Sequence, residues 1–288
     1  FGDRRKAMLA DLATLTVQAE RTKEAYEQND ATIVYEQTYN ILGEANWAPF
    51  AQALQEDDVQ WLQYVGTGDN LALLLQAIAG FDPLDPASVE SPPEDYVEAL
   101  DRSTRRLRIG LPRDVYFDDL DPEIAAAVDA AINVLREITA GTRDVTLPTV
   151  PNLSLLFVEA GAYLAPALAA SPEGFSPNIR ALVETGARIS AASYAEARRQ
   201  LALSRHAIRQ VFTEVDVLVT PTTPDLPSRI DAGAAPARRG PPLSARNTTP
   251  FNIYGLPTVS VCCGFSKSGL PIGLQISGPA FGDGTVLA

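Results

Sequence analysis

Short apolar runs that alternate with longer helical patterns constrain the fold of this chain more than any other feature. The run 107–111 is typical of a buried strand, a helical pattern follows, and 144–147 supplies the next strand. Asp121 suits a helix N-cap and Pro122 the first helical position, and apolar residues then recur at helical spacing over 124–138. A strand–helix–strand unit has parallel strands, so we expect an α/β fold whose sheet is covered by helices.

Three further apolar runs, 215–220, 258–263 and 274–277, predict strands in the C-terminal part of the chain. Leu, Val and Ile fill both faces of these runs, so we expect the strands to be central. The stretch 221–257 holds eight prolines and must be mostly irregular, which is typical of either a functional loop or a disordered segment beside a sheet. Helical patterns also cover 69–79, 154–169, 177–186 and 194–214.

Residues 1–63 differ in composition from the rest of the chain, with no serine, two glycines and one proline. Apolar residues recur at helical spacing over 8–19, and a second helical pattern covers 31–42. We therefore predict an N-terminal helical hairpin over 1–63. An α/β domain with a mixed, largely parallel central sheet should follow over 64–288.

Charge and reactive side chains exclude several classes of function. A formal net charge of −13 argues against nucleic acid and anionic membranes as partners, and no apolar run is long enough to span a bilayer. The two cysteines, Cys262 and Cys263, are adjacent on a predicted strand, so we interpret them as small buried residues in a reducing, cytoplasmic protein. His206 is the only histidine, so neither a Ser–His–Asp relay nor a histidine-rich metal site can form. We expect no metal and no cofactor.

Four sequence blocks, in this order, closely resemble the C-terminal half of amidase signature enzymes. The blocks are GTGDNLALLLQAIAGFDPLDPAS, VDVLVTPTTPDLP, NTTPFNIYGLPTVSVCCGF and SGLPIGLQISGPAFGDGTVLA. The resemblance covers residues 64–288. It implies a mixed sheet between layers of helices, and cleavage of small-molecule carboxamides by a lysine, a bridging serine and a nucleophilic serine. Backbone N–H groups of a Gly/Ser-rich loop would stabilise the oxyanion.

The segment that carries this chemistry in the family lies upstream of the block that begins at Gly66. The chain has no serine there, and its first serine is Ser88. Lys6 and Lys23 lie in the predicted helical surface, so we assign no catalytic residue and expect the chain to be inactive alone. Such a chain would be a fragment, a rearranged gene product or one piece of an assembly. The alternative is a non-catalytic scaffold or subunit that binds a partner chain, or a second copy, through 1–63.

Four polar residues are the candidates for substrate binding. They lie just beyond predicted strand ends, where α/β sheets place ligands: Thr222, Asn247, Thr248 and Asn252. The alternative is that they brace turns. We expect Thr222, Thr248 and Asn252 to converge on one shallow groove. Glutaminase subunits of tRNA-dependent amidotransferases carry an acidic residue where 244–246 reads Ser-Ala-Arg, so the resemblance favours a stand-alone amidase.

Overall fold

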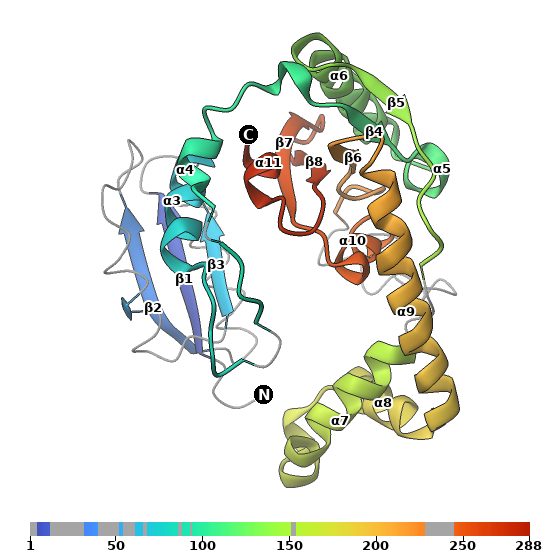
Figure 1. The fold of residues 1–288 in the computed structure, drawn as a ribbon. Coiled ribbons are helices and arrows are strands. Elements are labelled where there is room, and N and C mark those ends of the chain that lie inside the picture. The colour runs from blue at the N-terminus through green and yellow to red at the C-terminus, as the bar shows by residue number, and fades with distance from the viewer. Residues whose placement is uncertain are drawn as a thin grey trace. The chain divides into compact units, whose positions relative to one another are not determined.

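The computed structural model describes nine stretches of the chain. These are residues 5–11, 32–39, 52–53, 61–65, 68–85, 88–92, 94–150, 154–227 and 245–288. The chain divides into two compact units, one formed mainly by 1–101 with 164–182 and the other by 102–163 with 183–286 (Figure 1).

The first unit contains a three-stranded parallel sheet with the order β2-β1-β3. The strands are β1 (Arg5–Asp11), β2 (Thr32–Tyr39) and β3 (Trp61–Val65), and both outer strands pair with β1. Helices α3 (Gly68–Ile78) and α4 (Tyr96–Ala99) follow. The backbone N–H of Tyr96 donates to Gln76 Oε1 at 2.8 Å and so joins the start of α4 to α3.

The prediction of a helical hairpin is wrong for the described parts of its two helices, 8–19 and 31–42, which lie in strands. The start of the predicted helix 8–19 belongs to β1, and most of 31–42 forms β2. The sequence of β2, TIVYEQTY, is rich in β-branched and aromatic residues, which fit a pleated sheet better than a helix. Pairing along β1 outweighs the helical spacing of the apolar residues. The remainder of both predicted helices lies outside the described residues.

The second unit is built on a five-stranded mixed sheet, which confirms the predicted fold class. Its strand order is β5-β4-β6-β8-β7. β4 pairs in parallel with β5 and β6, whereas β8 is antiparallel to both β6 and β7. The strands are β4 (Ile109–Leu111), β5 (Thr142–Asp144), β6 (Val217–Pro221), β7 (Thr258–Phe265) and β8 (Pro271–Ser277).

Helix α6 (Pro122–Ile138) covers one face of this sheet. The Asp121 side chain accepts a hydrogen bond from the N–H of Glu123 at 2.8 Å, so the helix begins at the predicted cap. The apolar stripe of α6 packs on the inward side chains of β4, β6 and β8. The buried members of this core are Ile109, Leu111, Ile124, Val128, Ile132, Val217, Val219, Ile272 and Leu274.

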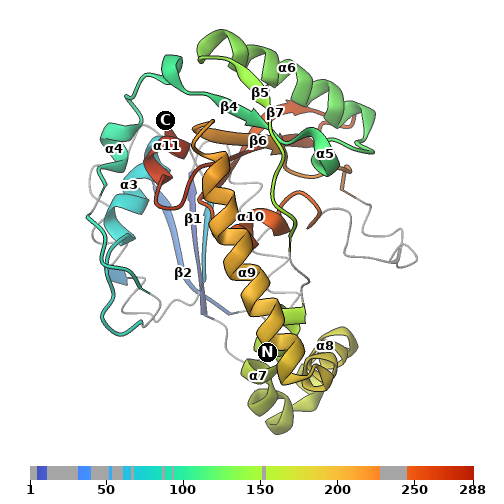
Figure 2. The same ribbon diagram turned by 45° about the vertical axis from the view of Figure 1, so that its right-hand side comes forward.

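The opposite face carries α9 (Ala191–Val211) and the short α10 (Thr249–Tyr254) (Figure 2). A second buried cluster lies here and includes Leu218 of β6 and Phe251 of α10. The remaining elements are α5 (Arg113–Tyr116), α7 (Ser154–Ala170), α8 (Pro177–Arg188), α11 (Asp283–Leu287) and the 3-10 turns η1 (Thr104–Arg106) and η2 (Pro172–Gly174). None of the described helices is long and apolar enough to cross a membrane.

Three expectations for the second unit need correction. β7 is the edge strand of the sheet rather than a central strand, and its residues are exposed or half-buried. Cys262 is exposed and only Cys263 is half-buried, so the two cysteines do not form a buried pair. Burial raises the pKa of the Cys263 thiol. Strand β5 ends at Asp144, where the predicted strand began, because its backbone pairs with β4 over 142–144.

Candidate functional site

The first residue of the loop that follows β6 forms hydrogen bonds to the two neighbouring strands β8 and β7. All five residues of β6 are buried, and the next residue, Thr222, is half-buried. The backbone N–H of Thr222 donates to the carbonyl of Gly273 in β8 at 3.0 Å. The Thr222 hydroxyl shares a hydrogen bond of 2.7 Å with the hydroxyl of Ser260 in β7. A side chain of the loop after β6 and a side chain of β7 thus meet across β8, the strand between β6 and β7.

Gly273 is the residue of β8 beneath this hydroxyl pair. A Cβ atom at Gly273 would lie 2.7 Å from the hydroxyl oxygens of both Ser260 and Thr222. Protein Cβ atoms do not approach oxygen so closely, so any side chain here would push the pair apart. The glycine therefore permits the contact between the loop after β6 and the edge strand.

Asn247 connects the segment before α10 to the end of β6 through hydrogen bonds. Its side chain is fully buried, and Nδ2 donates to the carbonyls of Tyr116 at 2.9 Å and Pro221 at 2.8 Å. The carbonyl of Asn247 accepts from Gln275 Nε2 at 2.9 Å, and the same nitrogen donates to Thr220 Oγ1 at 3.0 Å. Both hydrogens of the Asn247 side-chain amide therefore bind backbone carbonyls. This arrangement fits the alternative interpretation, in which the residue braces a turn rather than binds substrate.

The other two predicted site residues lie on the segment that Asn247 anchors. Thr248 is the half-buried N-cap residue of α10, and its carbonyl accepts from the backbone N–H of Asn252 at 3.4 Å. The side chain of Asn252 is exposed. The structure thus places Asn247, Thr248 and Asn252 on one short segment. The side chain of Asn247 links this segment to Pro221, the last residue of β6, which directly precedes Thr222. Convergence of Thr222, Thr248 and Asn252 on one groove stays a prediction.

Sequence reasoning missed Gln275, although β8 carried a signal for it. Gly273, Gln275 and Ser277 alternate with the apolar Leu274 and Ile276. The face with the polar residues holds three cross-strand hydrogen bonds, between Thr222 and Ser260, Gln275 and Thr220, and Ser277 and Thr258. This hydroxyl-rich face includes the buried side chains of Thr220, Gln275 and Ser277.

Backbone strain lies next to Asn247, in the segment around α5. Val115 has φ of 72° and Asp119 has φ of 47°, and both are unusual for residues other than glycine. Such conformations cost on the order of 1–3 kcal/mol each and persist only where the surroundings enforce them. Arg246 Nη2 donates to the carbonyl of Asp118 at 2.5 Å, and Asn247 holds the carbonyl of Tyr116. Two side chains of the segment 245–247 therefore form hydrogen bonds to the backbone of the strained loop 115–119.

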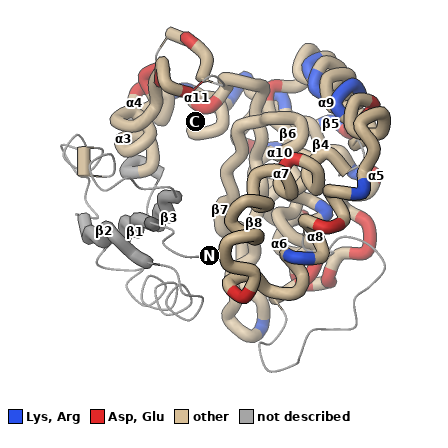
Figure 3. The backbone as a smooth tube through the Cα atoms, turned by 90° about the horizontal axis from the view of Figure 1, so that it is seen from below, with Lys and Arg blue, Asp and Glu red and all other residues tan. Residues whose placement is uncertain are grey.

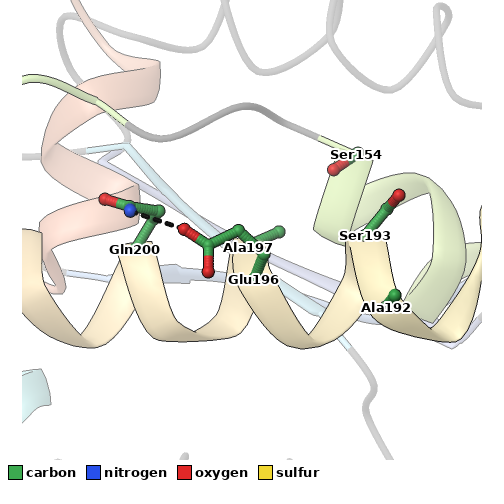
Figure 4. Close-up of a pocket in the computed structure, with 6 residues that line it drawn as sticks. All are labelled: Ser154, Ala192, Ser193, Glu196, Ala197 and Gln200. Atoms are coloured by element: carbon green, nitrogen blue, oxygen red, sulfur yellow. Dashed lines mark hydrogen bonds between the residues drawn. The ribbon is translucent and has the colours of Figure 1, made fainter.

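A hollow of about 430 Å³ lies along α9, away from these residues (Figure 4). It is lined by Ser154, Ala192, Ser193, Glu196, Ala197 and Gln200. Hydrogen bonds from Arg199 and Gln200 lower the pKa of Glu196 to about 2. A carboxylate with so low a pKa is a weak base, so Glu196 is a poor candidate for proton abstraction at neutral pH.

The five-stranded mixed sheet and its helical cover make the second unit an α/β domain, and comparison with known proteins identifies its family. The sequence pattern of the Amidase family matches residues 68–287. An amidase from Pseudomonas putida is 35% identical over 215 residues, which cover 71% of this chain and 46% of that protein. A glutamyl-tRNA(Gln) amidotransferase subunit from Roseiflexus sp. is 35% identical over 248 residues, covering 75% of this chain and 50% of that one.

A solved structure with the same fold is a bacterial aryl acylamidase of the amidase signature family. It superposes with a TM-score of 0.64 at 24% identity and covers 77% of this chain and 50% of its own. The chain belongs to the Amidase family. It spans about half the length of the curated relatives that it matches.

Proposed function

We propose that this chain supplies the substrate-holding part of an enzyme that hydrolyses carboxamide C–N bonds, and that the chain alone does not complete the reaction. The observation that carries the proposal is the family match over residues 68–287. It is supported by the Pseudomonas putida relative, which is named an amidase. We propose a small-molecule amide as substrate and, because both cysteines are free thiols, a reducing cytoplasmic setting.

The polar groups next to the end of β6 have the chemistry to hold a carboxamide. A carboxamide offers a carbonyl acceptor and N–H donors, and threonine hydroxyls and asparagine amides can both donate and accept. Thr222 and Thr248 are half-buried and Asn252 is exposed, so a small molecule can reach them. Asn247 acts one step behind them, because its hydrogen bonds fix the segment that carries Thr248 and Asn252.

The hydrogen-bond partners of two serine hydroxyls on the sheet, those of Ser260 and Ser277, support the proposal of inactivity. Hydrolysis by a serine needs a neighbouring base that removes the hydroxyl proton. Ser260 pairs with the hydroxyl of Thr222, and Ser277 pairs with that of Thr258. A hydroxyl partner is no base at neutral pH. The first serine of the sequence is Ser88, which supports the proposal that the serine loop of the family is missing from it.

Turnover and binding test the two parts of this proposal separately. We expect the purified chain to release no product from a panel of simple aliphatic and aryl amides. Turnover that a serine-directed phosphonate abolishes would refute the inactivity. Saturation-transfer NMR should detect weak binding of the same amides, reduced by Asn252→Ala but not by Asn133→Ala, an exposed asparagine on α6. Equal binding by both variants would remove Asn252 from the site.

A second candidate function is that of one component within a larger assembly. It is favoured by the relatives that are named as a subunit of a glutamyl-tRNA(Gln) amidotransferase. We retain residues 1–63 as a candidate partner surface, whose described residues include the strands β1 and β2. Size-exclusion chromatography with light scattering distinguishes this function, because a well-folded, strictly monomeric chain that no partner joins would contradict it.

A further inference from the structure

The segment 102–108, which runs directly into β4, is strongly basic. It carries four arginines and no acidic residue, in a chain whose formal net charge is −13. The hydroxyl of Thr104 donates to the carbonyl of Ile138 at the end of α6, at 3.2 Å. The backbone N–H of Ala140, before β5, donates to the carbonyl of Leu107 at 3.0 Å. The segment therefore lies against the end of α6 and the start of β5.

Three more arginines lie on the elements that adjoin this segment. β4 pairs in parallel with β5 and β6, so the amino ends of these three strands lie at one end of the sheet. α6 leads into β5 and α9 leads into β6, and both helices carry an arginine in their last turn. Figure 3 shows basic residues gathered around α9 and β5. We call six arginines at this end of the sheet the arginine cluster: Arg105, Arg106, Arg108, Arg136, Arg143 and Arg209.

Two members of the arginine cluster form ion pairs with acids. Arg108 Nη2 lies 2.8 Å from Asp216 Oδ1, and Arg143 Nη2 lies 3.2 Å from Glu214 Oε2. Arg108 Nη1 also donates to the carbonyl of Thr213 at 3.2 Å. These contacts hold the residues between α9 and β6 beside the amino ends of β4 and β5.

The other four members have no acidic partner among the described residues. Arg136 Nε donates to Thr142 Oγ1 at 3.0 Å and Arg136 Nη1 donates to Asn133 Oδ1 at 2.9 Å, and both acceptors are neutral. The acids next to these arginines in the sequence, Asp101 and Glu137, number two against four. The cluster therefore keeps a surplus of positive charge at neutral pH. Three of its members are exposed and form no side-chain hydrogen bond or ion pair within the described part of the chain: Arg105, Arg106 and Arg209.

We propose that the arginine cluster is a docking surface for a short acidic segment of a partner polypeptide. An arginine fork binds a carboxylate through two parallel N–H···O bonds. Three neighbouring strand ends span about 10 Å, and an extended peptide of about three residues crosses that distance. The inference goes beyond the proposed function and does not rest on it, because Thr222 follows the opposite end of β6.

Nucleic acid is a poorer occupant for the arginine cluster. Duplex DNA carries one negative charge per about 1.7 Å of its axis, so most of its phosphates would lie outside a surface about 10 Å wide. Those phosphates would face the rest of a chain whose formal net charge is −13. A short acidic peptide places its charges on the cluster alone.

Fluorescence anisotropy of a labelled hexaglutamate peptide tests the proposal on the full chain. We expect binding at an ionic strength of about 0.01 M that weakens at about 0.15 M, because the Debye length falls from about 30 Å to about 8 Å. Arg105→Glu and Arg106→Glu should each raise the dissociation constant at least about threefold, because charge reversal replaces attraction with repulsion. Arg188→Glu, at an exposed position on α8, is the matched control. It changes the net charge by the same amount and should leave the dissociation constant nearly unchanged.

Thermal unfolding of each variant shows whether it still folds, and the two positions keep the test decisive if one variant does not. Absence of binding at low ionic strength overturns the proposal. A loss of affinity that Arg188→Glu reproduces also overturns it, because the effect is then one of net charge. Tighter binding of a labelled six-nucleotide single strand of DNA than of hexaglutamate does the same, because the occupant is then a nucleic acid.

Discussion

Replacing Asn247 with alanine should destabilise the second unit more than any exposed substitution nearby. The asparagine side chain is fully buried and donates to two backbone carbonyls, those of Tyr116 and Pro221, at 2.9 and 2.8 Å. A buried acceptor that loses its donor costs about 1–3 kcal/mol. Loss of both donors therefore costs on the order of 2–5 kcal/mol, a large part of the roughly 5–15 kcal/mol that stabilises a typical domain.

The assay is urea-induced unfolding followed by circular dichroism, with the free energy of unfolding obtained by linear extrapolation. Asn252→Ala is the matched control, because it removes the same side chain from an exposed position five residues further along the same segment. We expect the control to change the free energy of unfolding by less than about 0.5 kcal/mol. Asn247→Asp keeps the size but removes both N–H donors, so it should cost at least as much as the alanine.

A small effect would refute this reasoning. If Asn247→Ala lowers the free energy of unfolding by no more than Asn252→Ala does, the buried hydrogen bonds do not hold the segment 245–254 on the sheet. The description of Asn247 as a brace would then be wrong. A direct role in the groove would become the better explanation for an asparagine at this position.

Two further perturbations test the packing and the electrostatics. Gly186→Ala should lower the melting temperature by several degrees, because a Cβ there would lie 2.0 Å from the carbonyl oxygen of Phe157. Gly80→Ala is the control and should be nearly neutral, because a Cβ at Gly80 would have no atom within 4 Å. Equal melting temperatures of the two variants would contradict the close crossing of α7 and α8. The side-chain hydrogen bond from Arg108 lowers the pKa of Asp216. The pair therefore stabilises the fold at any pH above the ordinary aspartate pKa of about 3.9. This stabilisation is lost as the pH falls through the lowered pKa of Asp216 in the folded protein. The melting-temperature difference between the wild type and Asp216→Asn should thus be constant near neutrality and shrink in acid; a difference that persists at the lowest pH would contradict the assignment.

Helix α6 shows how much of this fold the sequence determined by itself. Its cap at Asp121, its proline at position 122 and its apolar stripe all act within one helix, so no information from distant residues is needed to place it. Helix α3 was likewise predicted to within one residue at each end. Strands β6 and β8 were recognisable because both are buried and their apolar residues are continuous or alternating.

What only the tertiary structure decided is which neighbour each element has. Both β7 and β8 were predicted as central strands, yet β7 is an edge and β8 lies between two strands, because strand order depends on segments far apart in the chain. The strand over 32–39 exists through its pairing with β1, which outweighs a local helical pattern. Asn247 looked like Asn252 in the sequence, and the fold buried one against two carbonyls and left the other exposed. A hydrogen bond between residues 131 positions apart leaves no local pattern, so the three-dimensional fold alone could separate the brace from the accessible candidate.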